Sequence, residues 1–144
     1  MKKSLMKYRL QIHLLYKKIG RGYMKMKLEN KVALVTDGSS GMGREISKLL
    51  AKEGSSVVLV ARKKETLEDL VNEIKADGGK AVAVDGIPDN EEDIQNAISA
   101  ALIKFGKLDL IINTVNIAEV MSPVAEMGEG IWEVNLNVDL TGAI

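Results

Sequence analysis

The feature that most constrains this chain is a regular alternation of short apolar runs with longer segments of helical periodicity. Runs of four or five residues fit strands that are covered on both faces. They occupy 32–35, 57–60, 81–84 and 108–112. Helical spacing of apolar residues fills the segments 41–53, 67–74 and 94–105, and a last helix is expected at about 128–139. The alternation predicts an α/β domain with a parallel sheet of right-handed βαβ units.

Local signals define the first helix in more detail. Ile46, Leu49 and Leu50 recur at helical spacing and are expected to form its apolar stripe. Gly54 follows and is expected to end it, because glycine readily takes the left-handed conformation that closes a helix.

Charge divides the chain into two parts. Residues 1–27 carry nine Lys or Arg and no acidic residue, whereas residues 28–144 carry the other 11 basic residues and all 20 acidic ones. We therefore expect a basic extension at 1–27 and a domain at 28–144. The extension could act as an amphipathic helix on an anionic membrane or as a transit peptide. We favour a non-functional upstream extension, because Met24 and Met26 both precede the start of the domain.

Composition excludes several kinds of site. The chain has no cysteine and a single histidine, His13, so disulfides, thiolate metal sites and histidine metal clusters are excluded. No apolar run approaches the roughly 20 residues that span a bilayer. We expect no transmembrane segment and a cytoplasmic location. We also expect no nucleic-acid partner, because the body is acidic and no binding motif accompanies the basic extension.

A glycine-rich stretch, TDGSSGMG at 36–43, lies between the first strand and the first helix. In a parallel sheet this position is the ligand-binding edge, where the free N–H groups of a helix start favour phosphate. A tight turn with a helix cap explains the same residues without a ligand, but the strand–glycine–helix order favours a nucleotide. A P-loop is excluded, because no Lys-Ser or Lys-Thr follows the glycines.

These residues resemble the start of the short-chain dehydrogenase/reductase family of NAD(P)-dependent Rossmann enzymes. The family opens with Thr-Gly-x-x-x-Gly-x-Gly, and Thr36, Gly41 and Gly43 match it, while Asp37 replaces the first glycine. Asp85 stands where the family places an acid near the adenine. The resemblance covers residues 28–144 almost continuously.

Two later stretches extend the resemblance. Asn113 begins the family's Asn-Asn-Ala-Gly, although this chain reads Asn-Thr-Val-Asn at 113–116. Trp132 and the run 137–142 resemble the family's Trp-(Asp/Glu) and Val-Asn-Leu-x-Gly, with Asp139 at the position of the catalytic asparagine.

The resemblance implies a Rossmann-like doubly wound sheet with strand order 3-2-1-4, truncated after the fourth strand and the following helix. It also implies hydride transfer between a nicotinamide dinucleotide and an alcohol or carbonyl. The residues expected to bind the dinucleotide are Thr36, Gly38, Ser39, Ser40, Gly41, Met42, Gly43, Arg62, Lys63, Asp85 and Asn113.

The residues that follow the second strand favour NADP over NAD as the cofactor. An acid at its end would bind the ribose 2′-hydroxyl of NAD. Here Arg62, Lys63 and Lys64 follow the strand, and no carboxylate occurs before Glu65. Arginine is suited to a 2′-phosphate. Asp37 opposes binding, since a carboxylate about 5 Å from a diphosphate oxygen repels it by roughly 1 to 3 kcal/mol, a tenfold to hundredfold loss of affinity.

The family's general acid–base pair, Tyr-x-x-x-Lys, follows the Val-Asn-Leu stretch, but residues 108–144 contain neither tyrosine nor lysine. Tyr23 and Lys27 have the spacing by coincidence in the extension, and Ser122, which precedes a proline, is expected in a turn. We expect no catalytic residue in the chain, unless Asp139 replaces the asparagine, and no activity alone.

Two alternatives stay open. The chain is a non-catalytic nucleotide-binding or interaction module that self-associates or pairs with a full-length relative through an exposed sheet edge, or it is the first segment of a longer active enzyme.

Overall fold

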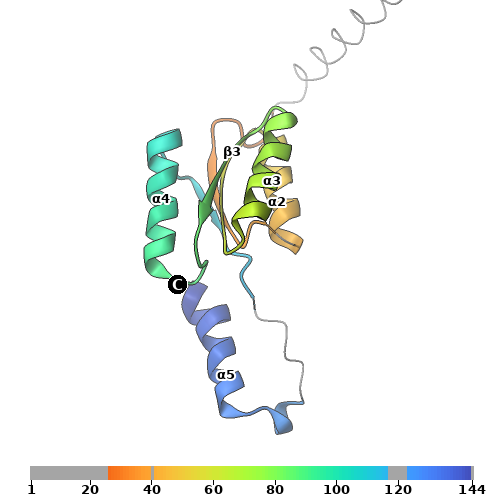
Figure 1. Ribbon diagram of the computed structural model, residues 1–144, viewed down its shortest axis with the longest axis vertical. Coiled ribbons are helices and arrows are strands. Elements are labelled where there is room, and N and C mark those ends of the chain that lie inside the picture. The colour runs from red at the N-terminus through yellow and green to blue at the C-terminus, as the bar shows by residue number, and fades with distance from the viewer. Residues whose placement is uncertain (1–25, 40, 117–122, 144) are drawn as a thin grey trace, which may run out of the picture.

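The computed structural model describes residues 26–39, 41–116 and 123–143 (Figure 1). Most of the predicted extension, including Tyr23, lies outside these residues, as do Ser40 and Ser122. The elements are β1 (Val32–Thr36), α2 (Gly41–Lys52), β2 (Ser56–Ala61), α3 (Lys64–Ala76), β3 (Lys80–Asp85), α4 (Glu91–Phe105), β4 (Leu110–Ile112), η1 (Val124–Glu126), α5 (Glu129–Asn135), η2 (Leu136–Leu140) and η3 (Thr141–Ala143).

The strands form one parallel sheet in the order β3-β2-β1-β4, which confirms the predicted order. β1 is buried along its whole length because it lies between β2 and β4. The register pairs Thr36 with Val60 and Ala61 with Asp85, so the carboxyl ends of β1, β2 and β3 lie at the same edge. This edge carries the glycine loop.

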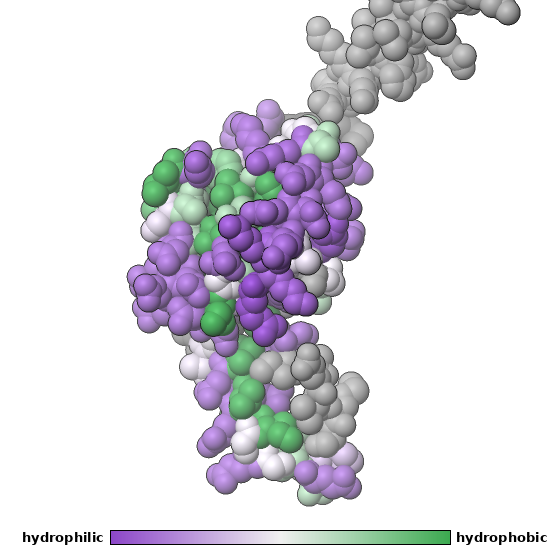
Figure 2. Space-filling model, viewed as in Figure 1, coloured by the Kyte–Doolittle hydropathy of each residue, from purple (hydrophilic) through white to green (hydrophobic). Residues whose placement is uncertain are grey.

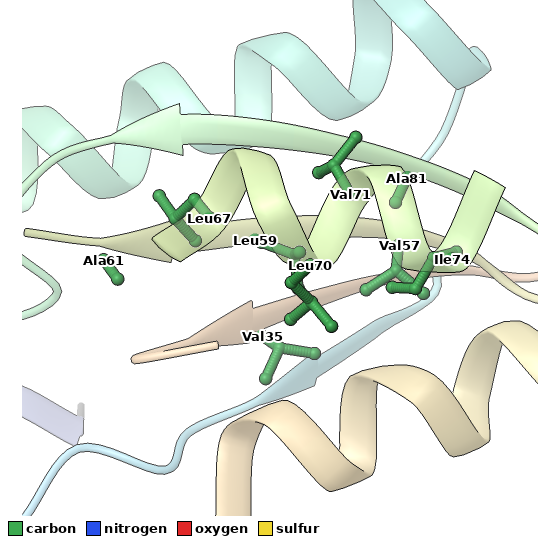
Figure 3. Packing of buried hydrophobic residues seen from close by; sticks show 9 residues of the cluster. All are labelled: Val35, Val57, Leu59, Ala61, Leu67, Leu70, Val71, Ile74 and Ala81. Carbon is green, nitrogen blue, oxygen red and sulfur yellow. The ribbon is translucent and has the colours of Figure 1, made fainter. Parts of the chain in front are cut away.

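Helices cover both faces of the sheet, with α2 and α3 on one face and α4 on the other (Figure 1). Alternate residues of the central strands therefore enter two cores. Figure 3 shows the first core, in which side chains of α3 lie against those of β1 and β2; its buried members are Val35, Val57, Leu59, Ala61, Leu67, Leu70, Val71, Ile74 and Ala81. The second core, under α4, consists of Val32, Leu34, Val58, Val60, Ala97 and Ala101.

Helix ends follow the local signals in the sequence. Gly54 has φ +94°, and Gly106, which caps α4, has φ +80°, conformations that cost glycine little. At the start of α4 the side chain of Asn90 accepts a hydrogen bond from Asp93 N. Met26 packs against Gly54, since a Cβ on that glycine would lie 2.9 Å from its sulfur.

The predicted apolar stripe of α2 is wrong at Leu49, whose side chain is 58% exposed. The buried line of the helix passes instead through Gly43 and Ser47. Ser47 is polar but donates its hydroxyl proton to Gly43 O at 2.6 Å, so it can be buried without an unmet hydrogen bond. Small residues on this line let α2 approach the sheet closely.

Asp109 fastens β4 to β1 at the amino end of the sheet. The fourth strand was predicted from Leu108 but begins at Leu110. Asp109, just before it, donates its backbone N–H to Val32 O and accepts from Val32 N with its side chain, each at 2.9 Å. Lys107 and Lys31 lie 3.0 and 3.3 Å from its carboxylate. The hydrogen bond from Lys107, followed by that from Val32 N, lowers the pKa of Asp109 to about 2.

The predicted last helix is confirmed by α5, which continues through η2 and η3. It lies outside the sheet and runs back towards it (Figure 1), so that a Cβ on Gly142 would lie 3.5 Å from Asp89 Cβ in the loop after β3. None of the residues of α5 is buried. Apolar side chains are exposed along it (Figure 2), namely Trp132, Val134, Leu136 and Leu140. Across the described ranges, no helix is long and apolar enough to cross a membrane.

Candidate dinucleotide site

The candidate site lies where β1 ends and α2 begins. Thr36 is the last residue of β1 and Gly41 the first of α2. The intervening turn is held to the neighbouring strand, because Gly38 N donates to Val60 O at 3.2 Å. Because α2 begins at the carboxyl edge of the sheet, the N–H groups of its first turn lie at this edge. The first N–H groups of a helix have no intrahelical partners.

Asp37 keeps the turn that the family builds with glycine. Its φ is +47°, in the left-handed region, and aspartate enters that region more readily than most side chains. The turn is therefore kept despite the substitution. The carboxylate nevertheless adds a negative charge to a loop whose amides would face phosphate.

Two glycines allow close packing behind the loop. A Cβ on Gly43 would lie 2.3 Å from the carbonyl oxygen of Asp37, and one on Gly38 would lie 2.9 Å from Leu59 Cδ2. Neither position has room for a side chain without displacement of its neighbours. These glycines therefore set how tightly loop, strand and helix pack.

The outer side of the loop is open. A Cβ on Gly41 would meet nothing within 4 Å, and the side chain of Met42 is 66% exposed. The first turn of α2 contains no acidic residue. Among the described residues, the space beside Gly41 is therefore open, and the dipole of a helix start favours negative charge.

The end of β4 closes the corner. Asn113 and Thr114 follow the strand, and the hydroxyl of Thr36 donates to Asn113 Oδ1 at 2.7 Å. Asn113 Oδ1 also accepts from Val115 N at 3.1 Å. Thr114 N donates to the Thr36 hydroxyl oxygen at 3.1 Å, and the Thr114 hydroxyl donates to the Thr36 carbonyl. These bonds tie the entrance of the glycine loop to β4.

Sequence reasoning missed the role of Thr114, which it treated only as a departure from the family motif. A weak signal was available. Thr36 ends one apolar run and residues 113–114 follow another, and such polar residues meet at one edge when the two strands are neighbours in a parallel sheet.

Arg62 and Lys63 lie beyond the end of β2, and both are exposed. Lys63 is the residue before α3 and makes no capping hydrogen bond with its side chain. Lys64, the third cation, lies 3.9 Å from Glu68. In the part of the chain that the structure describes, Arg62 and Lys63 form no ion pair, so their charges are available to an anion.

Asp85 ends β3 at the same edge and is exposed. The loop after it is fastened by Gly86 N, which donates to Ala61 O at 3.2 Å, and by Ile87 N, which donates to Asp93 Oδ2 at 2.8 Å. The side chain of Ile87 is 49% exposed and offers an apolar surface beside Asp85.

A hollow of about 470 Å³ opens between α2 and α3, beside the loop residue Ser39. On its wall Arg44 pairs with Glu73, and Lys48 lies 3.3 Å from the same carboxylate. The hydrogen bond from Lys48 is the main cause that lowers the pKa of Glu73. This ion cluster joins the two helices and leaves the helix start open.

The structure thus places most predicted binding residues along one edge, from Asp85 through Arg62 and Lys63 to the glycine loop and Asn113. Asp139 does not follow one of these strands; it lies in η2, after α5, and is exposed. Ser40 falls outside the described residues. No cluster of three or more potential metal ligands occurs in the described part of the chain.

Comparison with known proteins supports the family resemblance seen in the sequence. The family model for short chain dehydrogenases matches residues 31–144. An uncharacterized oxidoreductase of Listeria monocytogenes is 34% identical over 119 residues, which are 83% of this chain and 48% of that protein. A peroxisomal 2,4-dienoyl-CoA reductase of Arabidopsis thaliana is 36% identical over 86 residues, 60% of this chain and 29% of that one.

Solved structures agree. A citronellol catabolism dehydrogenase of Pseudomonas aeruginosa superposes with a TM-score of 0.73 at 30% identity, covering 84% of this chain and 49% of the other. A Serratia marcescens short-chain dehydrogenase/reductase mutant gives a TM-score of 0.72 at 28% identity, covering 80% and 47%. The chain spans about half the length of the relatives that it matches over most of its own length. On this shared motif order, fold and sequence, the chain belongs to the short-chain dehydrogenase family.

Proposed function

We propose that residues 31–144 bind NADP(H) in preference to NAD(H), as the dinucleotide-binding part of an oxidoreductase that acts on an alcohol or carbonyl. The observation that carries this proposal is the corner at 36–43. Its turn survives the presence of Asp37, its outer face is open above Gly41, and the helix start behind it has no acidic residue in its first turn. Nicotinamide, when bound, would give or accept a hydride.

The preference for NADP(H) rests on charge at the end of β2. Arg62 and Lys63 are exposed, and the acid that would bind an NAD ribose is absent before Glu65. An arginine gains more from a 2′-phosphate than from a 2′-hydroxyl, because guanidinium–phosphate hydrogen bonds are charge-assisted. Asp85, at the end of the neighbouring strand, is proposed to lie on the adenine side.

We further propose that the 144-residue chain, taken alone, does not turn over a substrate. The hydride step in the family needs a tyrosine whose proton transfer a nearby lysine assists, and residues 108–144 have neither. Asp139, exposed in η2, is proposed not to replace the family's asparagine, because an ionised carboxylate lacks the amide's N–H donors.

Calorimetric titration of the full chain with NADP⁺ and NAD⁺ tests the binding proposal. We expect NADP⁺ to bind at least fivefold more tightly, and Arg62→Ala to remove most of that difference while NAD⁺ affinity stays the same. Gly41→Val should abolish binding of both, because its φ of +47° strains a β-branched residue. Gly130→Ala is the matched control, since nothing lies within 4 Å of its Cβ position. Absence of NADP⁺ binding to the unmodified chain would refute the proposal.

A second function, a non-catalytic module that pairs with a full-length relative, is favoured by one observation. β4 is the last strand of the described sheet on its side, and the side chain of Ile111 is 56% exposed. An exposed strand edge can pair with another chain. Co-expression with a tagged relative tests this. Pairing that Ile111→Lys abolishes supports the module, whereas no co-purification at micromolar concentration removes it.

A further inference from the structure

Thr114 connects three elements at the glycine loop. It follows β4, its hydroxyl donates to the carbonyl oxygen of Thr36 at the end of β1, and its backbone N–H donates to the Thr36 hydroxyl oxygen at 3.1 Å. The same hydroxyl lies 2.8 Å from the position that a Cβ on Gly43 would occupy. It therefore fits in a notch between β1 and the first turn of α2.

The bond to the Thr36 carbonyl affects the loop through the peptide plane. The Thr36 carbonyl and the N–H of Asp37 belong to one planar peptide unit, so fixing the oxygen also fixes the direction of the first N–H of the loop. The next residues continue from that plane, with Asp37 at φ +47° and Gly38 N bonded to Val60 O at 3.2 Å. Rotation of this peptide would move every loop amide after it.

Only a short side chain can take this role. The notch is bounded by backbone on the Thr36 side and by Gly43 on the helix side. A hydroxyl on Cβ reaches the carbonyl directly. A valine of nearly the same shape fills the space without a donor, and would leave the carbonyl oxygen, which lies at a residue only 4% exposed, without this partner.

We propose that the Thr114 hydroxyl is a positioning group for the dinucleotide site: it fixes the Thr36–Asp37 peptide and so sets the glycine loop for a diphosphate. This inference rests on the proposed dinucleotide function. It assigns a specific task to a position at which the chain departs from the family motif.

The test compares Thr114→Val with Thr114→Ser in the full 144-residue chain. Affinity is measured for NADP⁺ and for adenosine 2′-monophosphate, which lacks the diphosphate. We expect Thr114→Val to lose about five- to tenfold in NADP⁺ affinity and less than twofold for the monophosphate, because the 2′-phosphate residues are untouched. Thr114→Ser should bind both as the unmodified chain does.

A second readout does not depend on any ligand. Amide hydrogen exchange at Gly38 should be unchanged in Thr114→Ser and faster in Thr114→Val, by more than the loss of global stability that the urea midpoint of Thr114→Val reports. Equal NADP⁺ affinity and equal exchange in Thr114→Val would overturn the inference, as would equal losses for both nucleotides. If Thr114→Val does not fold, Thr114→Ser decides alone, because a weaker binder that keeps the hydroxyl contradicts the proposal. If the unmodified chain binds neither nucleotide, the proposed function fails and the exchange comparison still tests positioning.

Discussion

Gly43→Ala is the sharpest test of how the loop and helix pack. The new Cβ would lie 2.3 Å from Asp37 O, 2.8 Å from Thr114 Oγ1 and 3.0 Å from Asp37 C. Two of these three atoms are backbone, so no side-chain rotation relieves the overlap, and α2 must move away from the loop by about 1 Å. Overpacking of this kind costs about 1 to 3 kcal/mol.

We expect the free energy of unfolding to fall by about 2 kcal/mol, which lowers the urea midpoint by about 1 M at the slopes usual for small domains. NADP⁺ affinity should fall as well, because the helix start moves relative to the loop. Gly130→Ala, with open space around its Cβ position, is the control and should leave the midpoint unchanged or raise it slightly. A Gly43→Ala midpoint equal to that of the unmodified chain would show that the corner is not packed as described.

Three further outcomes are expected. Asp37→Asn removes the charge and keeps a side chain that tolerates positive φ, so NADP⁺ affinity should rise about tenfold in calorimetry; unchanged affinity would show that the carboxylate does not face the diphosphate. Asp109 has a folded pKa of about 2, below its ordinary value of 3.8, so its stabilisation is present above about pH 4 and lost as the pH falls towards 2. The urea midpoint of Asp109→Asn should change less with pH across that range than the midpoint of the unmodified chain. Parallel pH profiles of the two proteins would contradict this. Ser47→Leu should lower the free energy of unfolding by about 1 to 3 kcal/mol through overpacking. Leu49→Ala should lower it by less than about 1 kcal/mol, because Leu49 is 58% exposed. The reverse order in urea titrations would show that Leu49 is buried, as the helical spacing predicted.

Sequence patterns predicted most of the fold because the signals are local. Buried strands of a parallel sheet read as continuous apolar runs, and 32–35 and 57–60 are such runs. Gly54 and Gly106 end their helices through backbone conformations that glycine adopts readily. The errors occurred where burial depends on contact rather than spacing. Leu49 has the spacing of a core residue, but the close approach of α2 at Gly43 and Ser47 turns it towards solvent.

The residues of the candidate site were predictable for a related reason. Parallel strands end at one edge, so any residue after β1, β2 or β3 that carries binding chemistry is brought there by topology alone. Thr36, Arg62 and Asp85 needed no knowledge of distances. The π-helical turn at η2, which holds Asp139, has no recognisable signal in the sequence, and we have no physical account of it.

Periodicity, glycine positions and motif order were enough to predict the βαβ alternation and the family, and to bring the proposed dinucleotide-binding residues to one edge of the sheet. The hydrogen bonds of Thr114 and Asp109 were decided only by the tertiary structure. Each joins β1 to a residue that flanks β4, across 77 or 78 positions in the sequence: Asp109 binds Val32, and Thr114 binds Thr36. The local sequence around Thr114 or Asp109 does not predict its hydrogen-bond partner, because the packing of the intervening strands and helices decides which distant residues come into contact.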